Sequence, residues 1–441
     1  MITHRNEKVF FVMFLLLIFL VAAFFFSPWG EKFAPKIVIS GETSLIGAQK
    51  EIALDVADTN SGLARIEVAF IQNGTKYTAF LKELGKGEEN KSFRSVTLLK
   101  PIEMGLKAGV AELEITASDR SLWKNEAKIS QQVVFDFIPP RIAIKSKLPN
   151  YTSQGGSSVV VYEASKRLVN TSVVVQNESY SAFPLAGKNN TYVAFFALPL
   201  KGNPRAAILA EDLAGNPVRV NIPMVVATKR IVHDRIAISS SLLAKTQDFA
   251  QQYNSLLGKS ASETFKAVNG GIREESDKRI RAICAVSAGQ KFWEGAFLRM
   301  QGSATMAKFG DQRTYLHEGK ILGRSVHLGV DLASTANAPI MASNNGIVVF
   351  AGDLGIYGNT VIIDHGLGLF SLYAHMDSIA VATVGSMVKK GQVIGKSGLT
   401  GLAVGDHLHF SLLIGGNFVE PLEWWDGRWV ANNIEARIKA I

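Results

Sequence analysis

The sequence is poor in cysteine, because its 441 residues include only Cys284. One thiol excludes a disulfide within the chain and a zinc site built from several cysteines. Charged residues are also scarce, at 19% of the chain against 47% hydrophobic residues, and this balance excludes a disordered chain. The sequence therefore describes a folded protein with room for about two to four domains.

Positive charge exceeds negative charge, since the chain has 47 lysines and arginines but only 38 acidic residues. The formal net charge is +9. A basic chain favours anionic surroundings such as cell-wall polymers, lipid headgroups or nucleic acid. The charge alone does not choose among these partners.

An apolar run without charge covers residues 9–26 and follows Arg5 and Lys8. As a helix it would span roughly 27 Å, close to the hydrocarbon thickness of a bilayer. A cleaved signal peptide is the alternative, but residues 24–29 offer no pair of small residues for cleavage. We therefore expect residues 1–30 to form a short cytoplasmic tail and a transmembrane signal anchor, with the rest of the chain exported.

Strand-like alternation, broken by Gly, Asn, Asp and Ser, dominates the chain after the apolar run. The sequence APKIVI at 34–39 is echoed by PPRIAI at 139–144, which indicates a repeated unit. We expect two tandem β-sandwiches, at 35–138 and 139–227, that resemble bacterial immunoglobulin-like modules.

Three aspartates stand at turns of these modules: Asp58, Asp119 and Asp212. We interpret them as turn-forming residues rather than calcium ligands, because aspartate side chains bond to the backbone of turns. We identify no cluster with evident chemistry in either module.

Residues 239–284 change to helical periodicity, and we expect a helical connector at 228–291. Cys284 falls on the apolar side of the second helix, which favours a buried structural thiol over a reactive one. The remaining chain predicts a β domain at 292–428 and a short amphipathic helix at 429–441. The expected fold class is therefore mainly β.

Six of the eight histidines follow residue 310. In the motif HLGVD at 327–331, alternation predicts a strand with His327, Gly329 and Asp331 on one face. The imidazole and the carboxylate then flank a residue with no side chain to obstruct a metal ion. A surface histidine and a surface aspartate would fit this fragment equally well.

A second motif, DHLHFSL at 406–412, places His407, His409 and Ser411 on one face of a strand. Two neighbouring imidazoles are costly as structural groups, because each ring nitrogen needs a partner and the rings repel when protonated. Zinc accepts such nitrogen ligands, with a carboxylate oxygen as third ligand and a water in the fourth position. This motif therefore favours a metal site.

A third motif, FSLYAHM at 370–376, alternates in the same way. Tyr373 and His375 are expected on one face of this strand, opposite its apolar residues. A lone histidine on a strand is usually structural, but the two other motifs strengthen the functional interpretation of His375.

Residues 309–426 resemble the catalytic domain of the lysostaphin/LytM-type zinc endopeptidases of bacterial cell walls. The resemblance rests on five segments in the family's order: Phe309-Gly310 with Arg313, HLGVD at 327–331, YGNTVIIDHGLGLFSLYAHM at 357–376, GSMVKKGQVIGKSGLTG at 385–401 and HLHF at 407–410. Asp406 departs from the proline that is usual in the family, and Ser411 departs from its frequent acidic residue.

The resemblance implies one zinc ion per chain, with His327, Asp331 and His409 as its ligands. It also implies two catalytic histidines. His407 would act as general base toward the zinc-bound water, and His375 would donate a hydrogen bond to the oxyanion of the tetrahedral intermediate.

Three further residues are expected around the substrate. Tyr373 would assist His375 at the oxyanion, while Asn359 and Tyr357 would line the substrate groove. The domain that carries them would be an antiparallel β catalytic domain of LytM type.

The expected function is a membrane-anchored zinc metalloendopeptidase that hydrolyses peptide bonds of peptidoglycan, in cross-bridges or stem peptides. It would sit in the bacterial inner membrane with its catalytic domain on the periplasmic side. Peptidoglycan and the membrane are the expected partners, and nucleic acid is not. The alternative is a non-catalytic regulator of another cell-wall hydrolase. A biotinyl- or lipoyl-like carrier, suggested by residues 385–395, fails because the residues that flank a modified lysine are missing.

Overall fold

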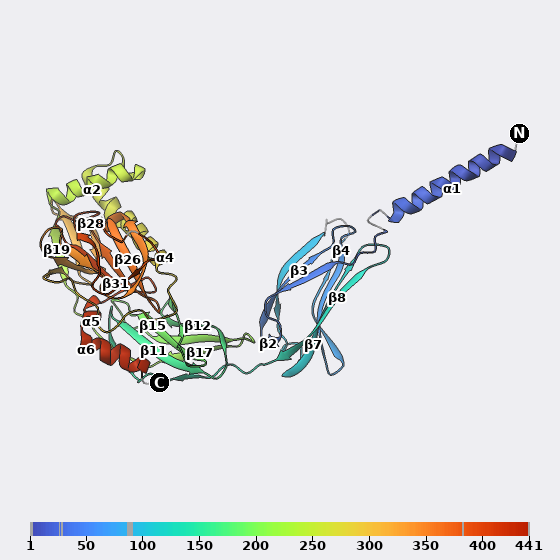
Figure 1. Cartoon of the computed structure of the whole chain (residues 1–441), viewed down its shortest axis with the longest axis horizontal. Helices are drawn as coiled ribbons and strands as arrows, with labels where there is room; N and C mark the ends of the chain where they lie inside the picture. Colours follow the sequence, from blue (N-terminus) through green and yellow to red (C-terminus); the bar gives the residue numbers. More distant parts are fainter. Residues whose placement is uncertain (1–2, 26, 28–29, 86–90, 382, 440–441) are drawn as a thin grey trace. The chain divides into compact units, whose positions relative to one another are not determined.

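Figure 1 shows the computed structural model, which describes the chain apart from residues 1–2, 26, 28–29, 86–90, 382 and 440–441. The chain divides into two compact units, residues 1–140 with 211–217 and residues 141–210 with 218–441. Strands dominate both units, so the mainly β fold predicted from the sequence is confirmed. The predicted domain boundaries within the units stay predictions.

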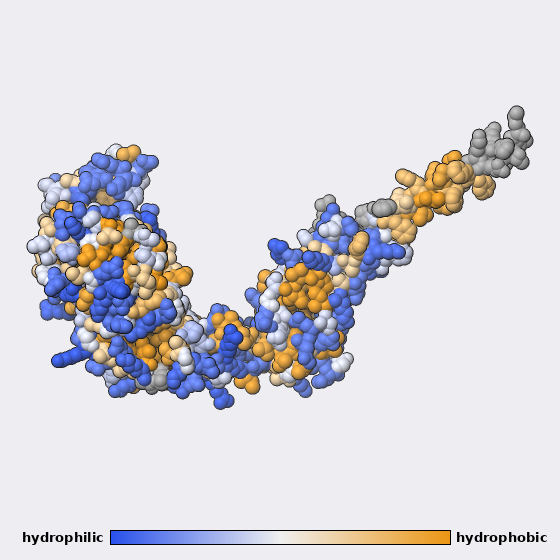
Figure 2. All heavy atoms as spheres, in the orientation of Figure 1, coloured by the Kyte–Doolittle hydropathy of each residue, from blue (hydrophilic) through white to orange (hydrophobic). Residues whose placement is uncertain are grey.

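Helix α1 (Thr3–Phe25) takes up the apolar N-terminal run. Its large apolar side chains from Val9 to Val21 are exposed, and Figure 2 shows hydrophobic residues along the coloured part of the helix. Within the described part of the chain, however, no helix combines the length and the apolar character that a membrane crossing needs. The expected transmembrane anchor at residues 9–26 is therefore unsupported by the structure, and Phe26 itself lies outside the described residues.

The first unit contains a β-sandwich of two sheets. One sheet has the order β1-β3-β6, from Lys36–Ser40, Lys50–Ala57 and Ser92–Leu99. The other has the order β2-β8-β7-β4-β5, from Leu45–Ile46, Glu126–Phe135, Gly109–Asp119, Leu63–Gln72 and Thr75–Glu83. Alternate side chains of both sheets, such as Leu54 and Val68, point into one core because side chains alternate along a strand.

The second unit begins with another two-sheet module. One sheet has the order β14-β15-β11-β9, from Phe183–Pro184, Thr191–Ala197, Ser157–Ala164 and Ile142–Ile144. The other has the order β13-β12-β16-β17, from Glu178–Ser181, Leu168–Val175, Ala206–Asp212 and Pro217–Ile222. A parallel pair is formed by β10 (Asn150–Ser153) and β18 (Met224–Ala227).

This module shares its hydrophobic core with the C-terminal domain. Phe195 of β15 packs against Trp293 and Trp424, with ring centroids 6.3 and 6.1 Å away. The indole of Trp424 also donates a hydrogen bond to Ser157 Oγ at 2.9 Å. The module and the C-terminal domain are therefore packed as one body.

The connector between them is helical, as predicted, but it begins with a strand. β19 (His233–Ala237) pairs in parallel with β21 (Gln312–His317), which pairs with β22 (Lys320–Val326). The helices are α2 (Ser240–Gln252), α3 (Ala261–Ala267) and α4 (Arg273–Ile283), with a π-helical turn at Val268–Ile272 between the last two. Ser239 caps α2, and Ser260 forms a capping box with Glu263 at the start of α3.

The C-terminal domain is built on an antiparallel sheet whose order is β20-β23-β31-β27-β26-β25-β29, with β32 paired to β31. Its strands are Ala304–Ala307, Val330–Ala333, Leu408–Ile414, Leu369–Ala374, Asn359–Gly366, Gly346–Asp353, Met387–Val388 and Asn417–Val419. A smaller sheet contains β24 (Pro339–Met341), β30 (Val393–Ser397) and β28 (Met376–Ile379). The described chain ends in helical turns: α5 (Pro421–Trp425), α6 (Gly427–Trp429), a π-helical segment (Val430–Glu435) and α7 (Ala436–Lys439).

Candidate metal centre and active site

Two neighbouring strands of the C-terminal sheet bring the predicted metal ligands together. Asp331 of β23 and His409 of β31 are direct partners in the antiparallel register, so their side chains stand side by side. His327 precedes β23 and reaches the same point from the loop. The predicted strand over 327–331 is thus shorter than expected, because β23 begins at Val330.

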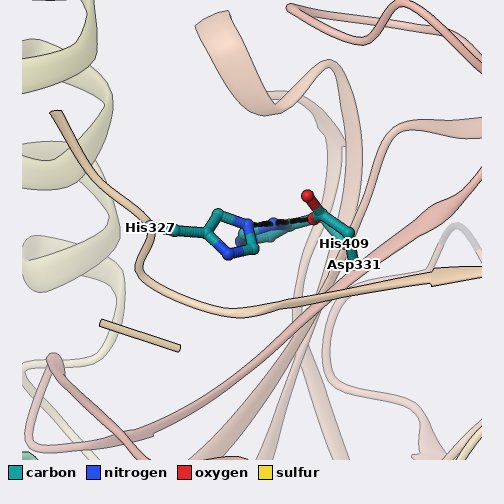
Figure 3. A group of neighbouring side chains, drawn as sticks. All are labelled: His327, Asp331 and His409. Atoms are coloured by element: carbon teal, nitrogen blue, oxygen red, sulfur yellow. Dashed lines mark hydrogen bonds and ion pairs between the residues drawn. The ribbon is translucent and has the colours of Figure 1, made fainter. Parts of the chain in front are cut away.

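Three donor atoms from these residues converge, as Figure 3 shows. Asp331 Oδ1 lies 3.0 Å from His327 Nε2 and 2.8 Å from His409 Nδ1, and the two nitrogens are 3.1 Å apart. Tetrahedral zinc with bonds of 2.0–2.1 Å would hold its ligand atoms about 3.3–3.4 Å apart. The three atoms are therefore already close to the spacing that one zinc ion requires.

The hydrogen bonds of the two rings show which nitrogens face the ion. His327 Nδ1 donates to the carbonyl of Lys308 at 2.9 Å, which leaves a lone pair on Nε2. Ser411 donates its only hydroxyl proton to the carbonyl of Leu328 at 2.9 Å, so it accepts from His409 Nε2 at 3.1 Å. Ligand histidines are commonly oriented by such outer bonds. The lone pair of His409 Nδ1 therefore also points at Asp331.

The electrostatics of the group agree with this arrangement. Burial lowers the pKa of His409 to about 4, so its ring is neutral at physiological pH. Burial alone would raise the pKa of Asp331, but the facing imidazoles hold it well below its usual value. Arg313 reaches Asp331 Oδ2 at 3.3 Å from the other side. Two imidazole nitrogens and a carboxylate oxygen thus meet at one point, and these donors fit zinc.

The two predicted catalytic histidines lie next to this group. The His375 and His407 rings are 4.9 Å apart by their centroids, and His375 is 5.8 Å from His409. His375 Nδ1 donates to the carbonyl of Thr400 at 2.8 Å, and His407 Nδ1 donates to the carbonyl of Gly405 at 2.7 Å. Both rings therefore keep Nε2 available for proton transfer.

Their surroundings set different protonation states. Burial holds the pKa of His375 well below its usual value, and the neighbouring imidazoles add to this effect. Burial would also lower the pKa of His407, but the Asp331 carboxylate, 3.6 Å from Nε2, raises it overall. His375 therefore takes up a proton at Nε2 less readily than His407 does. The division of catalytic roles between the two rings stays a prediction.

Tyr373 does not join the site, contrary to the expected alternation along its strand. The backbone of His375 has φ of 60°, which is a left-handed conformation. Strand β27 therefore ends at Ala374, and the His375 side chain does not continue the alternation of the strand. The hydroxyl of Tyr373 is buried and accepts hydrogen bonds from Ser343 N at 2.7 Å and Ser371 Oγ at 2.9 Å. The structure therefore does not bring the Tyr373 hydroxyl to the site, and its oxyanion role stays a prediction.

The two predicted groove residues differ in their placement. Tyr357 lines the cavity, but its hydroxyl donates to Asp277 Oδ1 of α4 at 2.9 Å. Asn359 lies outside the cavity lining, with its side-chain amide 3.4 Å from the carbonyl of Asp377. Tyr357 therefore lines the cavity and Asn359 does not, while a role of either residue in a substrate groove stays a prediction.

A cavity of about 310 Å³ contains all five histidine and aspartate positions predicted for the metal and the catalysis. One wall comes from the connector, through Ile236 of β19, Leu242 of α2, Phe265 of α3 and Arg273 of α4. No motif in the sequence indicates that these residues meet the site, because they come from a separate segment with ordinary helical periodicity.

Arg273 is the polar residue on this wall that the sequence interpretation missed. Its Nη2 donates to Asn269 Oδ1 at 3.3 Å, while its Nε is enclosed and has no hydrogen-bond partner. With Arg313 it gives the cavity two guanidinium groups. The cavity is therefore suited to a ligand that carries carboxylates.

The C-terminal domain matches known proteins in sequence. Residues 325–421 match the profile of Peptidase family M23. The DD-carboxypeptidase/endopeptidase Mpg of Neisseria meningitidis is 40% identical over 97 residues, which are 22% of this chain and 22% of that protein. The Peptidoglycan DD-endopeptidase ShyA of Vibrio cholerae is 37% identical over 97 residues, again 22% of each chain.

A shorter relative matches over a similar length. The Lipoprotein NlpD of Yersinia enterocolitica is 41% identical over 95 residues, which are 21% of this chain and 96% of that sequence. The chain therefore belongs to peptidase family M23, and its resemblance to the lysostaphin/LytM-type peptidases is confirmed for the C-terminal domain. The match spans about a fifth of the length of Mpg and ShyA.

Proposed function

We propose that this protein is a zinc-dependent endopeptidase that hydrolyses peptide bonds of peptidoglycan, in cross-bridges or stem peptides. The carrying observation is the convergence of His327 Nε2, Asp331 Oδ1 and His409 Nδ1 in a cavity that also holds His375 and His407. The names of two relatives, a DD-carboxypeptidase/endopeptidase and a peptidoglycan DD-endopeptidase, support this class of substrate.

The chain supplies the acid–base groups of the reaction. Bound zinc would polarise the scissile carbonyl and lower the pKa of a bound water toward neutrality. His407 would take a proton from the attacking water at Nε2 and pass it to the leaving amine. His375 would donate a hydrogen bond to the oxyanion from Nε2 after its ring takes a second proton from solvent, while its Nδ1–H stays on the Thr400 carbonyl. The negative charge of the oxyanion would favour this protonation.

The cavity also carries positive charge that suits an anionic peptide. Arg273 and Arg313 line it, and the enclosed Nε of Arg273 offers an unused donor. A stem peptide carries free carboxylates that would accept from such a donor. We therefore propose that Arg273 contacts a substrate carboxylate, at a distance from the reacting bond.

The proposed place of action is the periplasmic side of the bacterial inner membrane, where peptidoglycan is accessible. The support is the apolar sequence of residues 9–26 and the substrate class named for the relatives. Membrane attachment through this segment is a proposal from the sequence.

A non-catalytic role in cell-wall regulation is the competing function, and one relative is named only as a lipoprotein. The test is incubation of purified peptidoglycan with the zinc-loaded full chain, followed by mass spectrometry of the released fragments. Peptide fragments with new amino termini, absent after treatment with a chelator and absent with His407→Ala, are expected. If several chemotypes of peptidoglycan stay uncut by the zinc-loaded protein, the regulatory function is correct.

A further inference from the structure

Three buried carboxylates meet at one end of the β-sandwich in the first unit. Glu31 lies in the segment between α1 and β1, Asp58 directly follows β3, and Asp119 is the last residue of β7. Their exposed fractions are 7%, 5% and 1%. One oxygen from each lies within 4.8 Å of the others, so three acidic groups share a small enclosed volume.

No lysine or arginine in the described ranges forms an ion pair with any of the three. Lys32, next to Glu31, lies over the rings of Phe25 and Trp123, 5.5 Å from each centroid. Arg120, next to Asp119, donates its guanidinium hydrogens to backbone carbonyls, among them Leu63 O at 2.9 Å. Buried charges are normally paired or coordinate a metal, and here the two adjacent cations bond elsewhere.

The carboxylate of Glu31 has an unsatisfied oxygen. Its Oε1 accepts from Ser61 N at 3.0 Å and Ser61 Oγ at 2.7 Å, whereas its Oε2 is fully enclosed without a hydrogen-bond partner. A carboxylate oxygen buried without a partner is unfavourable, so this position would be stabilised by a cation or a donor.

The surroundings contain more oxygens than hydrogens to satisfy them. Asn125 Nδ2 has two hydrogens but lies within bonding distance of four oxygens: Asp119 Oδ2 at 2.7 Å, Glu31 O at 3.1 Å, Ser121 Oγ at 3.1 Å and Phe33 O at 3.4 Å. At least two of these oxygens are therefore left without a hydrogen from this amide. The site is rich in acceptors, as a site for a hard cation should be.

We propose that Glu31, Asp58 and Asp119 bind a calcium ion. All donors are oxygens, and no nitrogen or sulfur ligand that zinc would prefer is among them. Calcium takes six to eight oxygen ligands at about 2.3–2.6 Å in flexible geometry, whereas magnesium requires a tighter octahedron and retains water. Three convergent carboxylates with nearby carbonyl and hydroxyl oxygens match the calcium pattern.

The interpretation of Asp58 and Asp119 as turn formers is compatible with this role. Asp58 Oδ1 accepts from Gly62 N at 2.8 Å, and Asp119 Oδ1 accepts from Ser121 N at 3.1 Å. Each aspartate therefore shapes its own turn through Oδ1. Asp119 Oδ2 also accepts from Asn125 Nδ2 at 2.7 Å, and its remaining lone pair could bind an ion. Glu31 adds the ligand from the segment that leaves α1, so the ion would fasten this segment to the sandwich.

The test is calcium titration of the zinc-saturated full chain in detergent by isothermal calorimetry, with thermal unfolding in parallel. Saturating zinc keeps the histidine site occupied. We expect one calcium ion per chain, with Kd at or below about 1 mM, and magnesium at least tenfold weaker. Two results would overturn the assignment: magnesium binding as tight as calcium binding, or no calcium binding at a concentration 10-fold above this limit on Kd.

Conservative variants locate the site. Glu31→Gln and Asp58→Asn should each weaken calcium binding at least tenfold. Asp55 is a partly exposed carboxylate of β3 that pairs with Arg94, so it serves as the control. Asp55→Asn should bind calcium as tightly as the unaltered chain. Wild-type affinity in both site variants would place any bound calcium elsewhere and refute the proposal.

A separate measurement avoids variants of the ligands, whose folding could depend on the charge. Terbium replaces calcium in oxygen sites and emits when a nearby tryptophan is excited. Trp123, whose indole lies 3.3 Å from Gly30 O, should sensitise it, and Trp123→Phe should remove most of the emission that calcium displaces. Emission that is unchanged in Trp123→Phe would contradict a site at Glu31. The peptidase activity plays no part in any of these outcomes.

Discussion

Glu423 of α5 is a buried carboxyl that joins the β module of the second unit to the C-terminal domain. It accepts hydrogen bonds from Ser157 N at 2.9 Å, Ser157 Oγ at 3.1 Å and Ser153 Oγ at 3.0 Å. Burial nevertheless raises the pKa of Glu423 to about 7. The stability of this junction should therefore depend on pH in the neutral range.

The sign and the size follow from linkage. The folded-state pKa lies above the ordinary value of 4.5, so the unfolded chain loses this proton first as the pH rises. The stabilising contribution is complete below about pH 4.5 and is lost as the pH rises through about 7. The shift corresponds to about 3 kcal/mol of unfolding free energy.

The assay is urea denaturation of the full chain at pH 5 and pH 8, followed by tryptophan fluorescence, for the wild type and Glu423→Gln. The amide cannot ionise, so the stability of the variant relative to the wild type should rise by about 2–3 kcal/mol between these pH values. Glu163→Gln is the matched control, because Glu163 is an exposed partner of Lys145 in the same module. A relative stability of Glu423→Gln that does not change with pH would refute the reasoning.

Three further predictions concern the active site. Ser411→Ala removes the acceptor that orients His409, so zinc affinity in a chelator competition should fall about 10-fold or more; an unchanged affinity would show that the strand alone fixes the ring. Tyr373→Phe should lower stability by about 1–3 kcal/mol and leave kcat within about twofold, because its hydroxyl serves Ser343 and Ser371. A large loss of kcat would instead show that the Tyr373 hydroxyl takes part in catalysis. Arg273→Met should raise KM for peptidoglycan peptides by about 10-fold or more with zinc content unchanged, and an unchanged KM would exclude Arg273 from substrate binding.

The sequence indicated which residues converge, because His327, Asp331 and His409 belong to two short motifs on neighbouring strands. In HLHF the period of two places His407 and His409 on one face, and the HLGVD motif brings Asp331 to the neighbouring strand. The pairing of Asp331 with His409 is a long-range contact that periodicity does not contain. The resemblance to a family supplied that contact.

The failures arise where a single backbone conformation or a long-range contact overrides the local pattern. The left-handed φ of His375 separates it from Tyr373, and no residue type at that position signals the break. Arg273 reaches the cavity through the packing of α4, and Glu31 reaches Asp119 through the packing of a segment outside any strand. Such contacts depend on tertiary structure, so neither composition nor spacing indicates them.

The central claim is that His409 holds the metal and His407 acts on the substrate. The most direct test measures zinc per chain and peptidoglycan cleavage together in His409→Ala and His407→Ala. The account predicts that His409→Ala loses both zinc and cleavage, whereas His407→Ala keeps about one zinc per chain and loses cleavage. Full zinc content in His409→Ala, or undiminished cleavage by His407→Ala, would contradict it.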